Sequence, residues 1–310
     1  MFWYCNIKYL LKQLLCLSLL SFSCAAFAQQ ENESNDVQEE STTQTEPSAD
    51  SSAPTKPVEI PLPTSLIDQY ESDIKKSVDE SLIAPLLIGT DDFLTITQPD
   101  VHSSDKGVAI LLPDWGQAAV NPKAINFLRK RLPEEGWTTI TIQPMEKPLG
   151  YPIHHEKPNI AEEENNKLLI DYQQQLSPML TSVMEKAADY PGIFIVIAQG
   201  NNAAQLLNIY LQEEVEKPNA LILLSAHLLT DKDNAQLSTS IAESEIPILD
   251  LWLKKDSYWV NHFAKQRAMY ARKELKTYYR QRQLTNFNTG YYPEQALAKE
   301  IKGWLTTIGW

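Results

Sequence analysis

Cysteine is nearly absent from this chain, and basic residues are in the minority. The three cysteines are Cys5, Cys16 and Cys24, and none follows position 24. If residues 1–28 are removed, as argued below, the rest has no disulfide, no thiolate metal site and no cysteine nucleophile. The net charge is −13, from 27 Lys and Arg against 40 Asp and Glu. This charge argues against nucleic acid or an anionic membrane surface as a partner, because both bind basic patches.

The start of the chain has no acidic residue before Glu31. Lys8 and Lys12 precede an apolar stretch at positions 14–27, which ends in Ala26-Phe27-Ala28. A basic start, a short apolar core and small residues flanking a cleavage point are typical of a secretory signal peptide. We therefore predict a signal peptide over residues 1–28 and a periplasmic or secreted product. After cleavage we expect no stable membrane span.

Two other interpretations of this segment stay open. It could remain uncleaved as a membrane anchor, although it is shorter than the roughly 20 residues that span a bilayer. It could also be a lipoprotein signal that ends at Cys24. The residues before that cysteine, Ser21-Phe22-Ser23, lack the aliphatic side chain that lipoprotein signals usually carry.

Residues 29–57 lack apolar side chains almost completely. They are mostly Gln, Glu, Ser, Thr, Asp, Asn and Pro, and Val37 is the one large aliphatic residue before position 57. Such a segment cannot bury enough apolar surface to offset the entropy lost on ordering. We predict a disordered acidic and polar linker over 29–57, followed by one folded domain over 58–310.

The sequence of the predicted domain has a mixed α/β pattern. Two short runs at 81–89 and 93–98, separated by a turn, predict a hairpin. After them, continuous apolar strands alternate with helical patterns, which predicts a mostly parallel sheet with helices on both faces. Predicted strands are 107–112, 137–142, 193–198, 220–225, 246–253 and 278–284. Predicted helices begin at Asn121-Pro122 and cover 161–188 with a break at Pro178, 203–211, 259–276 and 293–307.

This order resembles the α/β-hydrolase fold. The run Gly107–Gly116 looks like its third strand with the following oxyanion loop, in which a backbone N–H is donated to the reacting oxygen. Residues 195–204 stand where the strand, the nucleophile elbow and the helix belong. Residues 246–256 look like the late strand whose following loop carries the catalytic acid, here Asp256.

A narrower resemblance covers about Ile67 to Trp310. The segments that carry it are Gly107–Gly116, Gln199-Gly200-Asn201, the stretch around Gly136-Trp137, and the ending Ile301-Lys302-Gly303-Trp304-Leu305. Together they are similar to an exported bacterial α/β-hydrolase-like family known as domain of unknown function 3530. The resemblance implies the fold and export, and it brings no assigned reaction.

The residues that a serine hydrolase needs are missing. In the elbow pattern G-x-S-x-G, the serine position falls on Gly200, which has no side chain to attack with. The loop before the last helix, residues 285–293, contains no histidine to act as the base. Asp256 stands where the acid of the triad belongs, and the alternative is an ordinary polar loop residue, because an orienting acid has no role without its histidine. We therefore predict no catalytic residue of the usual kind, no cofactor and no metal.

Two other groups of residues are candidates for catalysis or metal binding. Ser225 and His227 lie two apart at a strand end, where α/β sheets bind ligands. His154-His155-Glu156 is a possible metal pair, but no third ligand has a recognisable spacing. Trp115, Tyr291, Tyr292 and Trp252 could line a pocket or belong to the core.

The sequence favours a non-catalytic protein of the cell envelope that binds a small molecule or another envelope protein. The alternative is an esterase-like hydrolase with a non-standard catalytic set, for example one in which Asp256 activates water. The candidate ligand-binding residues are Asp114, Trp115, Gly116, Gly200, Asn201 and Asp256.

Overall fold

Aliphatic and β-branched residues form the strands of one sheet. The computed structural model describes residues 63–310 apart from 89, 90, 104 and 214, so the segments predicted as signal peptide (1–28) and linker (29–57) lie outside the described residues. The strands are β1 (Ile83–Ile88), β2 (Asp91–Gln98), β3 (Gly107–Leu112), β4 (Trp137–Ile142), β5 (Ile193–Gln199), β6 (Ala220–Leu224), β7 (Ile248–Leu253) and β8 (Tyr279–Leu284).

The strand order is β1-β2-β4-β3-β5-β6-β7-β8. β1 and β2 pair antiparallel, as do β2 and β4, and all later neighbours are parallel. This confirms the predicted fold class, a mostly parallel sheet with an antiparallel N-terminal hairpin. It also brings the carboxyl ends of β3, β5, β6 and β7 to one edge, where ligands bind in open α/β sheets.

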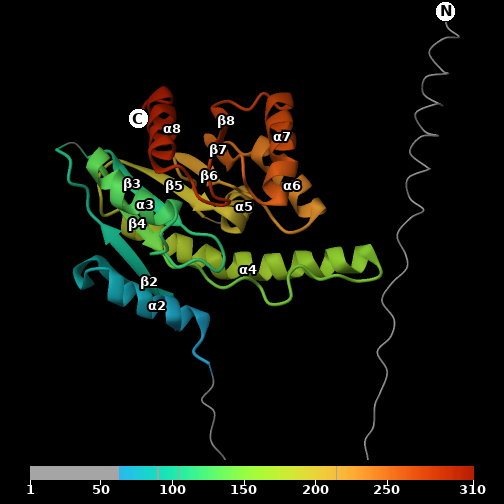
Figure 1. The fold of residues 1–310 in the computed structure, drawn as a ribbon, viewed down its shortest axis with the longest axis horizontal. Coiled ribbons are helices and arrows are strands. Elements are labelled where there is room, and N and C mark those ends of the chain that lie inside the picture. Colours follow the sequence, from blue (N-terminus) through green and yellow to red (C-terminus); the bar gives the residue numbers. More distant parts are fainter. Residues whose placement is uncertain (1–62, 89–90, 104, 214) are drawn as a thin grey trace, which may run out of the picture. The chain divides into compact units, whose positions relative to one another are not determined.

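Helices cover both faces of the sheet (Figure 1). One face packs α4, α5 and α6 against alternate residues such as Val108 and Val196, and the other packs α3 and α8 against Ala109 and Ile195. The helices are α2 (Leu66–Ser77), α3 (Ala124–Arg131), α4 (Pro158–Ala187), α5 (Gly200–Leu211), α6 (Asp231–Glu243), α7 (Tyr258–Lys273) and α8 (Glu294–Thr307). Within the described part of the chain, no helix is both long and apolar enough to cross a bilayer.

Three helix predictions need correction. α3 is preceded by Lys123 as its N-cap, and not by Asn121. α5 begins at Gly200, three residues earlier than expected, because the strand turns directly into the helix. α4 does not break at Pro178. A proline removes one backbone hydrogen bond, but buried Leu176 and Met179 anchor the helix on both sides of it.

Two helices were not predicted. α6 is amphipathic only through Leu237 and Ile241, although Thr230 caps it by accepting a hydrogen bond from the N–H of Asp233. α2 precedes the hairpin and packs Ile74 against Leu94 and Ile96 of β2. Both helices contain few apolar residues, so the helical periodicity of their sequences was weak.

Candidate functional site

The elbow between β5 and α5 has the backbone of a nucleophile turn without the nucleophile. β5 ends at Gln199 and α5 begins at Gly200, whose φ is 62°. This left-handed conformation favours glycine, as the sequence predicted. There is also no room for a side chain, because a β-carbon on Gly200 would overlap the carboxylate of Asp114. The absence of a nucleophile is therefore built into the packing at the elbow.

Asp114 follows β3 and places its carboxylate over Gly200. Its Oδ1 accepts hydrogen bonds from the backbone N–H of Trp115 (2.8 Å), the backbone N–H of Asn201 (2.7 Å) and the Nδ2 of Asn201 (3.1 Å). In α/β hydrolases the oxyanion hole consists of the N–H after the nucleophile and an N–H from the loop after the third strand. Asn201 and Trp115 hold these two positions. Both N–H groups donate to the protein's own carboxylate.

The charge on Asp114 is stabilised by His227 and by the N–H donors of Asn201 and Trp115. Burial raises the pKa of Asp114, and the charge of His227 and the hydrogen bonds from Asn201 and Trp115 oppose this rise in part. Asp114 takes part in none of the salt bridges found among the described residues. A strongly perturbed acid is a common mark of a functional site, which makes Asp114 a candidate.

His227 approaches this carboxylate from the loop after β6. Its backbone N–H donates to the carbonyl of Gly200 (3.3 Å), and its Nδ1 lies 2.8 Å from the carbonyl oxygen of Ser225. A carbonyl only accepts, so Nδ1 carries a proton and, in the neutral ring, Nε2 is the acceptor. The structure therefore brings His227, Gly200 and Asp114 together, which the sequence treated as separate candidates.

Ser225, Asp256 and Tyr292 form a second cluster at the same edge. The Oγ of Ser225 lies 2.5 Å from Asp256 Oδ2 and 2.7 Å from the hydroxyl of Tyr292. Asp256 also accepts from the backbone N–H groups of Leu253 and Ser257, both at 2.9 Å. Both carboxylate oxygens are thereby engaged within the protein. Ser225 has φ of 51°, a costly conformation for a non-glycine residue.

The loop after β8 places Tyr292 near the acid where a hydrolase carries its histidine. Its hydroxyl reaches the carbonyl oxygen of Leu251 (2.9 Å) as well as Ser225. Burial raises the pKa of Tyr292 well above its ordinary value, and the charge of Asp256 adds to the rise. A neutral phenol of this kind cannot replace the missing base.

Trp115 belongs to an aromatic group above Asp114. Its ring packs edge-on against Tyr172 at 5.4 Å and Tyr151 at 5.8 Å, and it is 8% exposed. Tyr172 donates to Asn202 Oδ1 (2.6 Å) next to the elbow. Neither tyrosine was a sequence candidate. Their positions on and before α4 are far from the elbow in the chain, and no local motif marks them.

Gly116 is the exposed member of the oxyanion loop, with φ of 63°. Its carbonyl accepts a hydrogen bond from the hydroxyl of Tyr70 on α2 (2.7 Å). α2 is therefore tied to the candidate site, a contact that the sequence did not indicate.

The remaining candidates lie elsewhere. Asp250 of β7 pairs with Arg267 of α7 in the interior. Tyr291 is exposed and lies beneath the Nζ of Lys123, 5.9 Å from the ring centre. His155 Nδ1 accepts from the backbone N–H of Lys157 (3.0 Å). Among the described residues, no three His, Cys, Asp or Glu side chains come together as a metal site.

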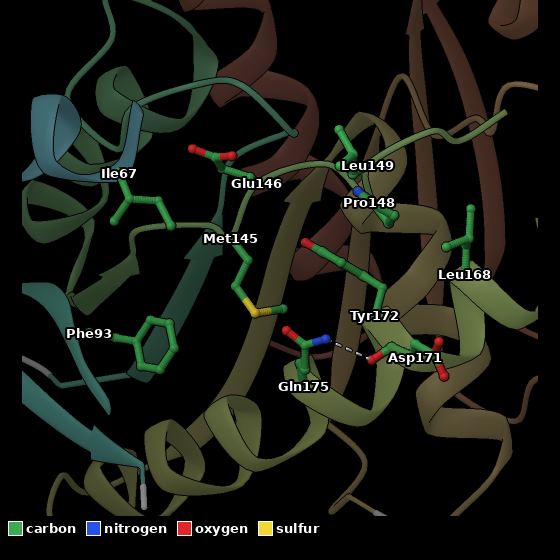
Figure 2. A pocket seen from close by; sticks show the side chains of 10 residues that line it. All are labelled: Ile67, Phe93, Met145, Glu146, Pro148, Leu149, Leu168, Asp171, Tyr172 and Gln175. Atoms are coloured by element: carbon green, nitrogen blue, oxygen red, sulfur yellow. Dashed lines mark hydrogen bonds between the residues drawn. The ribbon is translucent and has the colours of Figure 1, made fainter. Parts of the chain in front are cut away.

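A cavity of about 470 Å³ lies beside the site (Figure 2). Tyr172 lines this cavity and also belongs to the aromatic group over Asp114, so the two lie on either side of one side chain. Its lining residues are Ile67, Phe93, Met145, Glu146, Pro148, Leu149, Leu168, Asp171, Tyr172 and Gln175.

Comparisons with known proteins agree with this geometry. A family model described as "Protein of unknown function (DUF3530)" matches residues 12–177 and 154–307. No curated protein matches the chain.

Solved structures with the same fold include two dienelactone hydrolases and an esterase. A putative dienelactone hydrolase from Klebsiella pneumoniae is 13% identical, with a TM-score of 0.50 and coverage of 72% of this chain and 97% of that one. A dienelactone hydrolase from Anabaena variabilis is 11% identical, with a TM-score of 0.51 and coverage of 73% and 96%. The esterase, from Thermogutta terrifontis, is 9% identical, with a TM-score of 0.51 and coverage of 73% and 94%. These similarities establish the α/β-hydrolase fold.

Proposed function

Because this chain belongs to the family described as protein of unknown function (DUF3530), its fold comes with no reaction, and we propose that it is a binding protein of the cell envelope. The ligand, a small molecule or another envelope protein, contacts the carboxyl edge of the sheet where hydrolases carry their active site. Asp114, Trp115, Gly116, Gly200, Asn201 and Asp256 are the proposed binding residues at that edge.

The observation that carries this proposal is the carboxylate of Asp114 in the oxyanion hole. Acyl transfer needs the donors of that hole for the oxygen of the tetrahedral intermediate. Here Asn201 and Trp115 already donate to Asp114 Oδ1. A substrate oxygen would have to displace a carboxylate held by three hydrogen bonds. The same carboxylate excludes a nucleophile at position 200.

Export is the second part of the proposal. It rests on the signal pattern of residues 1–28, and residues 29–57 would then tether the domain. N-terminal sequencing of the protein from an envelope fraction should give Gln29 as the first residue. A lipid-modified Cys24 at the start would instead make the protein a lipoprotein and contradict a periplasmic or secreted product.

Activity-based labelling tests the non-catalytic part. The purified protein should not react with a fluorophosphonate probe, and it should hydrolyse simple acyl esters no faster than buffer. Gly200→Ser should remain unlabelled, because residues 285–293 offer no histidine, and the general-base step alone is worth roughly 10²–10⁴-fold. Stoichiometric labelling of the unmodified protein would contradict the proposal, and Ser225 is the first residue to inspect.

A second candidate function is a hydrolase in which Asp114 replaces the missing nucleophile. The favouring observation is that Asp114 Oδ1 is held by N–H donors, while no hydrogen bond among the described residues ends on Oδ2. Oδ2 lies over Gly200, and His227 presents Nε2 as an acceptor that could activate water. Attack of Oδ2 on an alkyl carbon would form an ester and expel the leaving group.

Mass spectrometry distinguishes the two functions. On incubation with a bromoalkane, a nucleophilic Asp114 would release bromide and gain the mass of the alkyl group, and Asp114→Asn would not. Asp256→Asn is the matched control, because that carboxylate is saturated by internal hydrogen bonds. The binding proposal expects no alkylation of Asp114 above the level of Asp256.

A further inference from the structure

The cavity beside the oxyanion loop is apolar inside and acidic at its edges. It lies between α2, β2, the loop after β4 and α4, and Phe93, Met145 and Tyr172 point toward its centre (Figure 2). Its volume, about 470 Å³, falls within the range of small-molecule sites, roughly 300–1,000 Å³.

The charges around this cavity have one sign. Glu146 on the loop and Asp171 on α4 are the charged residues that line it, and no lysine, arginine or histidine in the described chain does so. The nearest lysine in sequence, Lys147, donates its Nζ to the carbonyl of Tyr151 (2.6 Å). A ligand therefore meets aliphatic and aromatic carbon inside and two carboxylates at the edge.

The cavity is coupled to the candidate site through packed side chains. Tyr172 lines it, packs edge-on against Trp115 and bonds Asn202 beside the elbow. α2, which contributes Ile67 to the lining, is tied to Gly116 by Tyr70. A ligand in the cavity would contact Tyr172, which packs against Trp115, and α2, which is tied to Gly116 through Tyr70.

We propose that this cavity binds a cationic amphiphile, an aliphatic chain with one ammonium group. The chain occupies the apolar interior, and the ammonium group lies at the edge of the cavity, where Glu146 and Asp171, on opposite sides of it, both contribute negative charge (Figure 2). This inference rests on the proposed binding function and deepens it by naming the class of ligand. It adds no catalytic step.

The expected affinities follow from the two parts of the ligand. Burying one more methylene group should tighten binding about three- to fourfold until the cavity is full. Each exposed carboxylate should contribute up to about fivefold toward the ammonium group, and its contribution should fall as salt is added.

Isothermal titration calorimetry of the whole processed chain tests the proposal, with probes kept below their micelle concentrations. Decyltrimethylammonium should bind, and octyltrimethylammonium should bind about tenfold more weakly for its two fewer methylenes. Tetramethylammonium, which lacks the chain, and decyl sulfate, which has the opposite charge, should not bind measurably.

Two pairs of variants locate the site. Gln175→Trp fills the cavity from an exposed position and should abolish binding, whereas Gln174→Trp, next to it but outside the lining, should not. Glu146→Gln and Asp171→Asn should each weaken the cation up to about fivefold. Glu164→Gln removes an exposed charge of α4 that lies outside the lining and should leave affinity unchanged.

Three results would overturn the inference. Binding that survives Gln175→Trp lies elsewhere on the protein. Equal binding of decyl sulfate and decyltrimethylammonium would show that the site does not select a cation. If Gln175→Trp then abolished the binding of both, the proposed binding function would still stand. Absence of binding by every probe removes the ligand class. Failure of the proposed function is read separately, from fluorophosphonate labelling or alkylation of Asp114.

Discussion

Asp250, which is buried, and Asp114, which is partly exposed, are both acids at the sheet, and the protein compensates their charges in different ways. Asp250 is 0% exposed and meets Arg267, also 0% exposed, through Nε at 2.8 Å and Nη2 at 3.2 Å. Tyr279 and Gln281 donate to it as well, at 3.0 and 2.8 Å. Asp114 has only N–H donors as hydrogen-bond partners among the described residues.

This difference distinguishes a carboxylate that stabilises the fold from one that is available to bind another group. A buried carboxylate with a bidentate arginine and two further donors is satisfied, and it links β7, α7 and β8. A carboxylate held after β3 by two backbone N–H groups and one side-chain amide, all on Oδ1, retains an oxygen for other contacts. The segment after β6 connects the two, because Ala226 accepts from Arg267 Nη1 (3.2 Å) and His227 donates to Gly200.

The largest effect should come from breaking the Asp250 pair. Arg267→Met leaves a buried carboxylate without its cation, which should lower the free energy of unfolding by about 3–5 kcal/mol. Urea unfolding followed by circular dichroism measures this. Adding Asp250→Leu should restore part of the loss, since the unpaired buried charge is then gone, while Tyr279 and Gln281 lose an acceptor. A loss below about 1 kcal/mol would mean that the pair is not a structural element.

Gly200 tests whether the Asp114 carboxylate excludes a side chain. Gly200→Ala adds the cost of a β-carbon at positive φ, about 1–2 kcal/mol, to the overlap with Asp114. Gly116→Ala is the matched control, because Gly116 has nearly the same φ and open space around it. Gly200→Ala should therefore destabilise more than Gly116→Ala in urea unfolding. Equal losses would mean that Asp114 moves aside freely; in an Asp114→Gly background we expect them to converge.

Ser225 tests whether the cluster with Asp256 is structural. Ser225→Ala removes the contacts to Asp256 and Tyr292 and should cost about 1–2 kcal/mol. Tyr292→Phe removes the other hydroxyl, and the double variant should cost less than the sum because the two groups share one network. Thermal unfolding of the three variants measures the coupling. Fully additive losses would show that the hydroxyls act independently.

The smallest expected effect is a dependence of the unfolding free energy on pH. Burial raises the pKa of Asp114, so the folded protein retains this proton to a higher pH than the unfolded chain does. Between the ordinary aspartate pKa and the raised one, stability from this group falls as pH rises. Asp114→Asn should not show this loss of stability. The difference in unfolding free energy between Asp114→Asn and the unmodified protein should therefore shift in favour of the variant as pH rises above about 4. A constant difference across pH would contradict a raised pKa.

Local patterns predicted most of the fold. A continuous apolar run gave β3 with its observed bounds, the strand predicted at 137–142 is β4, and alternation of strands and helices gave the parallel sheet. Prediction was wrong or incomplete where packing overrides local preference. Pro178 stays inside α4 because its neighbours are buried, and the weakly amphipathic α2 and α6 were not found.

The candidate site was predicted in its parts and not in its arrangement. The sequence candidates included Asp114, Trp115, Gly200 and Asn201. The sequence did not predict that Asp114 accepts hydrogen bonds from the N–H groups of Trp115 and Asn201, or that His227 lies close to it. Tyr70 and Tyr172 were missed, since each reaches the site from a helix remote in sequence.

The sequence by itself determined the fold class, the glycine at the elbow and the lack of histidine in residues 285–293, because each depends on residue type or on local spacing. Only the tertiary structure decided what fills the space above Gly200. Pairing of β3 with β5 brings Asp114 to Asn201, 87 positions later in the chain. A contact of that separation is set by strand order, and no local pattern encodes it.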